Sequence, residues 1–200
     1  VLKDDLREEA LKGVELIQNA GIQVVMITGD AKDTATSIAK EVGIIKDSSD
    51  IVLTSTELNY YSDEQIKEIL PRLRVVARAL PQDKSRLVKL SLEQNFVVGM
   101  TGDGVNDAPA LKKANVGFAM GSGTEVAKEA SDIVILDDNI LSISQAILYG
   151  RTIFKSIRKF IIYQLTCNFC ALFLSIIGPF IGVNTPITII QMENCILLIL

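Results

Sequence analysis

The 200-residue sequence contains no histidine, and its 20 basic and 24 acidic residues leave a net charge of −4. A catalytic triad built on histidine and a metal site ligated by histidine are therefore both excluded. Because basic residues are not in excess, we expect no nucleic-acid partner. The 3 cysteines all lie in the apolar C-terminal part, and their odd number does not indicate the disulfide framework of a secreted protein. The charged and polar start, VLKDDLREEA, predicts no cleavable signal peptide.

Charged residues are also missing from Phe160 to Met192. A helix needs about 20 mostly apolar residues to cross a bilayer, so this run predicts a spanning helix from about Lys159 to Ile177. The segment GPFIGVNTP then predicts a short loop, followed by the start of a second apolar helix. A buried hairpin in a soluble core is the alternative interpretation of the same run.

Four basic residues precede this apolar run: Arg151, Lys155, Arg158 and Lys159. Positive charge next to a spanning helix marks its cytoplasmic side. We therefore expect an integral membrane protein in which residues 1–158 are cytoplasmic and the GPFIGVNTP loop lies on the opposite side.

Short apolar runs alternate with helix-like segments over residues 1–140. The expected strands are VVMIT, VVARAL, FVVGM, VGFAM and IVIL. This alternation predicts an α/β fold with a doubly wound, mostly parallel sheet, followed by a long helix that begins near Asn139 and enters the membrane. We expect one domain over residues 1–145 and a stalk and membrane segment over residues 146–200.

The motif TGDGVND follows one of the expected strands. Gly102 and Gly104 allow a tight turn, and Asp103 offers carboxylate oxygens of the kind that bind Mg²⁺. Asn106 and Asp107 can cap the next helix or orient a phosphate and the water shell of a metal. A turn and helix cap without any ligand is the alternative.

A second motif, TGD, follows an earlier strand. The Thr28 hydroxyl and the Gly29 N–H can hold phosphate oxygens, and Asp30 can cap a helix or reach a ribose. Lys84 falls in the first turn of a helix that begins with Pro81, where its charge can lie between a phosphate and carboxylates. Taken singly, a structural turn explains TGD equally well, and a surface lysine is the better explanation of Lys84.

Taken together, MTGD, PQDK and TGDGVNDAPALKKA resemble the phosphorylation domain of P-type ATPases, which has a haloacid dehalogenase-like fold. The resemblance continues through VGFAMGSGTEVAKEASDIVILDDN to FIIYQLTCNF. The forms PQDK and QLTCNFCA are most similar to calcium pumps of the plasma-membrane type and their bacterial relatives. This resemblance implies an enzyme that uses ATP and Mg²⁺, forms an aspartyl phosphate and moves calcium across the cell membrane.

The resemblance also implies a role for each motif residue. Thr28 and Gly29 would bind phosphoryl oxygens, Asp30 would support the nucleotide, and Lys84 would balance charge on the aspartyl phosphate. It places the Mg²⁺ ligands at Asp103 and Asp107.

By the same resemblance, Asn106 and Asp107 orient the phosphate and the metal shell. In the membrane segment, Asn168 is implied as a ligand of the transported cation.

The DKTGT segment that such pumps phosphorylate does not occur in the sequence. The resemblance therefore implies a C-terminal part of a pump that is inactive alone, with the nucleotide-binding and actuator domains of the same protein as partners. The alternative is a membrane-tethered, Mg²⁺-binding phosphatase or a non-catalytic regulatory module.

Overall fold

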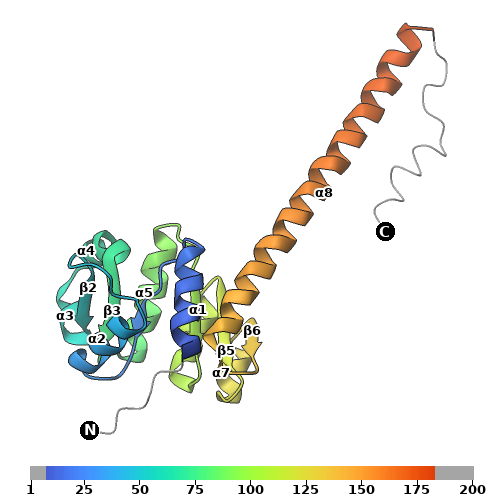
Figure 1. Cartoon of the computed structure of the whole chain (residues 1–200). Helices are drawn as coiled ribbons and strands as arrows, with labels where there is room; N and C mark the ends of the chain where they lie inside the picture. The colour runs from blue at the N-terminus through green and yellow to red at the C-terminus, as the bar shows by residue number, and fades with distance from the viewer. Residues whose placement is uncertain (1–7, 183–200) are drawn as a thin grey trace. The chain divides into compact units, whose positions relative to one another are not determined.

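The computed structural model describes residues 8–182, and Figure 1 traces them from blue to red. The chain divides into two compact units, Val1–Ala146 and Ile147–Leu200. The second apolar helix expected near the C-terminus lies outside the described residues. The two units are taken in turn below.

The first half of unit one builds a three-stranded sheet with the order β1-β3-β2. All its pairings are parallel. The strands are β1 (Met26–Ile27), β2 (Ile51–Thr54) and β3 (Leu73–Ala77). The helices of this half are α1 (Glu8–Asn19), α2 (Lys32–Glu41), α3 (Ser55–Tyr60), α4 (Asp63–Ile69) and the 3₁₀ turn η1 (Leu70–Arg72).

The second half builds another parallel three-stranded sheet, with the order β4-β5-β6. Its strands are β4 (Gly99–Gly102), β5 (Val116–Met120) and β6 (Ile133–Ile135). Its helices are α5 (Pro81–Glu93), the 3₁₀ turn η2 (Val105–Asp107), α6 (Ala108–Lys113) and α7 (Glu125–Glu129). The predicted doubly wound parallel architecture is confirmed, but the strands form two sheets where the sequence suggested one.

Both faces of the first sheet are covered, as parallel sheets require. Val76 packs in one buried cluster with Leu58 and Ile66. Its neighbours Val75 and Ala77 pack in another, which holds Ala35 and Ala39 of α2 and Val14 of α1. The alternation of side chains along β3 therefore supplies two separate cores.

Helix α5 packs against both halves of unit one. Leu87 and Leu90 belong to a buried cluster of the first sheet, whereas Val88 packs with Met100 and Leu111 of the second half. Since α5 carries Lys84 in its first turn, this shared packing sets the position of that lysine relative to both sheets.

Unit two contains most of helix α8, which runs from Ile140 to Phe180 without a break at Gly150. The helix is long and apolar enough to cross a membrane, with a mean hydropathy of 1.9 in its most apolar stretch. The predicted loop was placed too early, because Gly178 and Pro179 lie in the last helical turn. Pro179 has no N–H to donate to the carbonyl four residues earlier, and the helix ends one residue later, at Phe180.

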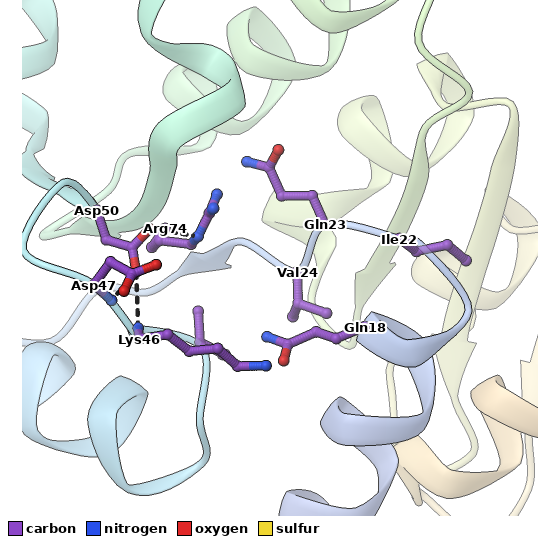
Figure 2. Close-up of a pocket in the computed structure, with 9 residues that line it drawn as sticks. Gln18, Ile22, Gln23, Val24, Lys46, Asp47, Asp50 and Arg74 are labelled. Carbon is purple, nitrogen blue, oxygen red and sulfur yellow. Dashed lines mark hydrogen bonds and ion pairs between the residues drawn. The ribbon is translucent and has the colours of Figure 1, made fainter.

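A cavity of about 190 Å³ lies at the amino ends of the first sheet's strands, lined among others by Gln18, Gln23 and Lys46 (Figure 2). On its wall, Arg74 Nε lies 3.0 Å from Oδ1 of Asp50, whose side chain is only 5% exposed. The strand ends that carry TGD and TGDGVND lie at the opposite edge, so this cavity is separate from those motifs.

Asp50 predicts a pH dependence of folding. Hydrogen bonds from Asp47 N and Lys46 N, aided by the charge of Arg74, hold the pKa of Asp50 below its ordinary value. A lowered carboxyl pKa stabilises the fold above the ordinary pKa of about 4, and this stabilisation is lost as the pH falls below it.

We therefore expect Asp50→Asn to lower the free energy of unfolding by about 1–3 kcal/mol at pH 7. The substitution should also flatten the loss of stability between pH 4 and pH 2.5, measured by urea unfolding. Asp47→Asn is the control, because that side chain lines the same cavity without such bonds. Equal acid sensitivity of the wild type and Asp50→Asn would contradict the assignment.

Candidate functional site

The sequence motifs gather at the carboxyl edge of the two sheets. TGD follows β1, the α5 helix follows β3, and TGDGVND spans the end of β4 and the turn η2. Lys84 Nζ donates to Oδ1 of Asp107 at 2.5 Å, and these side chains are 20% and 7% exposed. A lysine from one half and a carboxylate from the other thus meet in a half-buried position.

The TGD loop is fixed to the segment that joins β3 to α5. Thr28 N donates to Val76 O, Ala79 N donates to Thr28 O, and Arg78 N donates to Asp30 O, at 2.9–3.0 Å. Arg78 has a φ of 49°, a left-handed conformation that is uncommon outside glycine. Backbone hydrogen bonds therefore hold the TGD loop against the segment that leads into α5.

Within the loop, the Thr28 hydroxyl donates to Asp30 Oδ2 at 2.7 Å, and Asp30 N donates back to Thr28 Oγ1 at 3.2 Å. A β-carbon added at Gly29 would meet nothing within 4 Å, so space is open beside its N–H. The loop can therefore present a hydroxyl and an N–H to an anion.

Asp107 is buried and closes the TGDGVND loop. Its Oδ2 accepts from Asp103 N and Gly104 N, each at 3.4 Å, while Oδ1 accepts from Lys84. Both carboxylate oxygens therefore already have protein partners. Asp107 therefore connects Lys84 to the backbone of the TGDGVND loop.

The two glycines of the loop are not equivalent. A β-carbon at Gly102 would lie 2.4 Å from Asp107 Cβ, whereas one at Gly104 would approach no closer than 3.8 Å. Gly102 therefore allows the Asp107 side chain to fold against the end of β4.

The side chains of Asp103 and Asn106 are exposed, and within residues 8–182 neither has a hydrogen bond or ion pair. The described residues hold no group of three acidic or thiol side chains that could bind a metal by themselves. One carboxylate is still enough for Mg²⁺ when a phosphate and water complete its shell. Asp103 fits that type of site.

Sequence reasoning did not anticipate a second ion pair near this edge. Lys32 Nζ bonds both carboxylate oxygens of Glu57, at 2.9 and 2.8 Å. The bond from Lys32, followed by that from Thr54 N, holds the pKa of Glu57 below its ordinary value. The spacing of Thr54 and Glu57, typical of a capping box, was the available signal.

Asn168 lies on α8 and belongs to unit two. Its side chain is exposed, and its Oδ1 accepts from Gln164 Nε2 one helical turn earlier, at 3.3 Å. The structure therefore shows a polar pair on an otherwise apolar stretch of the helix.

The fold and the arrangement of this edge define a class of protein. A model of haloacid dehalogenase-like hydrolases matches residues 1–115, and a second such model matches residues 87–147. The chain belongs to the haloacid dehalogenase-like hydrolase family.

Several proteins similar to this chain are calcium-transporting ATPases. It is 44% identical over 196 residues to calcium-transporting ATPase 12, plasma membrane-type, of Arabidopsis thaliana, covering 96% of this chain and 19% of the relative. It is 49% identical over 178 residues to calcium-transporting ATPase 2 of Schizosaccharomyces pombe, covering 88% and 14%. It is 41% identical over 189 residues to calcium-transporting ATPase 1 of Lactococcus lactis, covering 94% and 21%.

The solved structures that this chain resembles include a zinc-transporting ATPase. A zinc-transporting PIB-type ATPase in its E2·Pi state superposes with a TM-score of 0.66 at 28% identity, over 92% of this chain and 25% of that one. The chain thus spans about a quarter or less of these relatives.

The glycine geometry leads to a prediction. Gly102→Ala should lower the free energy of unfolding by about 1–3 kcal/mol, because the new β-carbon displaces Asp107 or the β4 backbone. Gly104→Ala, at φ −105°, should change it by less than about 0.5 kcal/mol. Urea unfolding of both variants tests this, and equal effects would contradict the proposed role of Gly102.

Proposed function

We propose that this chain is the phosphorylation domain and the following membrane helix of an ATP-driven cation pump that forms an aspartyl phosphate. The observation that carries the proposal is the Lys84–Asp107 contact beside the open Asp103 carboxylate, at the edge where both TGD motifs end. Phosphoryl transfer depends mainly on positioning and charge neutralisation, which these residues can supply.

The split sheet supports a larger parent protein. Among the described residues, β1 pairs only with β3 and β4 pairs only with β5. A parallel strand from elsewhere in the protein can pair with both edges, and its carboxyl end would then lie beside Lys84 and Asp103. We propose that this strand carries the aspartate that is phosphorylated.

In the proposed reaction, the carboxylate of that aspartate attacks the γ-phosphorus of ATP and the bond to ADP breaks. Water later cleaves the acyl phosphate and releases inorganic phosphate. Asp103 would hold Mg²⁺, which would supply positive charge to the phosphoryl oxygens.

The residues of this chain bind and orient the phosphoryl group in that scheme. Thr28 and Gly29 donate to its oxygens, with Asp30 on the nucleotide side, while Asn106 orients the phosphate and Asp103 contributes the carboxylate for Mg²⁺. Lys84 has three N–H donors, of which one is held by Asp107. The remaining donors are available to the phosphoryl oxygens.

Calcium is the cation that we propose, because the relatives in plants, yeast and bacteria are calcium-transporting ATPases. The proposed location is the cell membrane, with residues 1–158 cytoplasmic and α8 crossing the bilayer. The nucleotide-binding and actuator domains would be supplied by the rest of the same protein.

Asp103→Asn tests the phosphate site in the longer protein that contains this chain. Loss of a charged Mg²⁺ ligand removes several kcal/mol of transition-state stabilisation, so formation of acid-stable phosphoenzyme should slow by about 100-fold or more. Asp47→Asn, at the opposite edge of the sheet, is the control and should be unaffected. Ordinary phosphoenzyme formation by Asp103→Asn at limiting Mg²⁺ would refute the assignment.

Asn168→Ala tests whether this residue binds the transported cation and whether that cation is calcium. Polar groups within a membrane span often mark an ion pathway, and losing one ligand should lower apparent calcium affinity by about tenfold. Phosphorylation from inorganic phosphate should persist, because the substitution leaves the carboxyl-edge residues intact. Ala171→Leu, which removes no ligand, is the control.

Unchanged calcium affinity in Asn168→Ala would leave the side chain with a packing role only. If Asn168→Ala changes the affinity for sodium, potassium or protons instead, the proposal of a cation pump stands and the proposal of calcium as its cation is refuted.

A further inference from the structure

A buried polar contact lies next to Lys84, and the scheme above gives it no role. Ser55 Oγ donates to Oδ2 of Asp83 at 2.6 Å, and Leu80 N donates to the same oxygen at 2.8 Å. Ser55 is 7% exposed and Asp83 only 2% exposed. A carboxylate this deeply buried is costly unless hydrogen bonds compensate it.

The contact joins two elements that are separate in the sequence. Ser55 is the first residue of α3, directly after β2, and Asp83 is in the first turn of α5. An acidic residue can cap its own helix through a single backbone N–H, which Leu80 N already provides. The bond from Ser55 is additional, and it ties the start of α5 to the carboxyl end of β2.

The same stretch of chain is held from its other side. Arg78 N and Ala79 N donate to Asp30 O and Thr28 O in the TGD loop. The segment between Arg78 and Lys84 is therefore fixed to β1 by backbone bonds and to β2 by the Ser55–Asp83 contact. Lys84 follows Asp83 directly and extends to Asp107.

We infer that Ser55 and Asp83 are positioning residues, which hold the first turn of α5 so that the Lys84 ammonium lies at Asp107. The functional weight of this inference rests on the proposed function, in which Lys84 balances the charge of the phosphoryl group. Neither residue touches the reacting atoms in that scheme. Their effect is transmitted through the backbone of one helical turn.

Amine labelling of the 200-residue chain measures the placement of Lys84 without requiring any activity. A lysine held by a carboxylate reacts slowly, so Ser55→Ala should raise the labelling rate of Lys84 by about threefold or more, followed residue by residue with mass spectrometry. Asp83→Ala should do the same. Asp83→Asn keeps an acceptor oxygen for both donors and should have a smaller effect.

Lys67 is a matched internal control. Its side chain is 24% exposed, close to the 20% of Lys84, and it pairs with Glu93 at 2.6 Å. Its labelling should not change in Ser55→Ala, and an increase at both lysines would indicate general unfolding. Ser62→Ala, which removes the capping box of α4, is the control variant and should leave Lys84 at its wild-type rate.

The second measurement is formation of aspartyl phosphate by the longer protein. Ser55→Ala should slow it about threefold or more, and Ser62→Ala should leave it unchanged.

The inference is overturned if Lys84 is labelled at the wild-type rate in a folded Ser55→Ala variant. If Ser55→Ala unfolds, Asp83→Ala decides, and wild-type labelling of Lys84 in that variant overturns the inference. Faster labelling with unchanged aspartyl phosphate overturns its functional part. A wild-type longer protein that forms no aspartyl phosphate refutes the proposed function, while the labelling result still decides whether Ser55 and Asp83 place Lys84.

Discussion

The contact between Lys84 and Asp107 joins the two halves of unit one at the edge that carries the motifs. Lys84 is held by α5, which packs against both halves through Leu87, Leu90 and Val88. Asp107 is held by the loop whose backbone N–H groups it accepts. Because each partner is fixed by its own half, the geometry of the edge depends on how the two halves pack.

The motifs could be located from the sequence because they are local. TGD, PQDK and TGDGVND each follow an apolar run, and the carboxyl ends of parallel strands meet at one edge. The strand β2 (Ile51–Thr54) was missed, although its first three residues are apolar and it pairs in parallel with β3. The capping residues Thr54 and Ser62, which mark the helices after it, were present in the sequence as signals.

Other features of the edge depend on contacts that no local pattern contains. Asp83 looks in sequence like any acidic residue in a first helical turn, yet its burial depends on Ser55, 28 positions earlier. The sequence gives no reason to treat Gly102 and Gly104 differently. Only the packing of Asp107 shows that a β-carbon fits at Gly104 and not at Gly102. The bonds that the Asp107 carboxylate accepts from Lys84 and from Asp103 N likewise could not be inferred from the motif alone.

The two incomplete sheets have a consequence for the chain when it is produced alone. Strands β1 and β4 each present one unpaired row of backbone N–H and C=O groups within the described part of the chain. Such edges template pairing with other molecules and are a source of aggregation. Neither edge strand carries a lysine or a proline, the residues that natural sheets use to block this pairing. Association of unit one with other molecules therefore depends on the same edges that an inserted strand would cover.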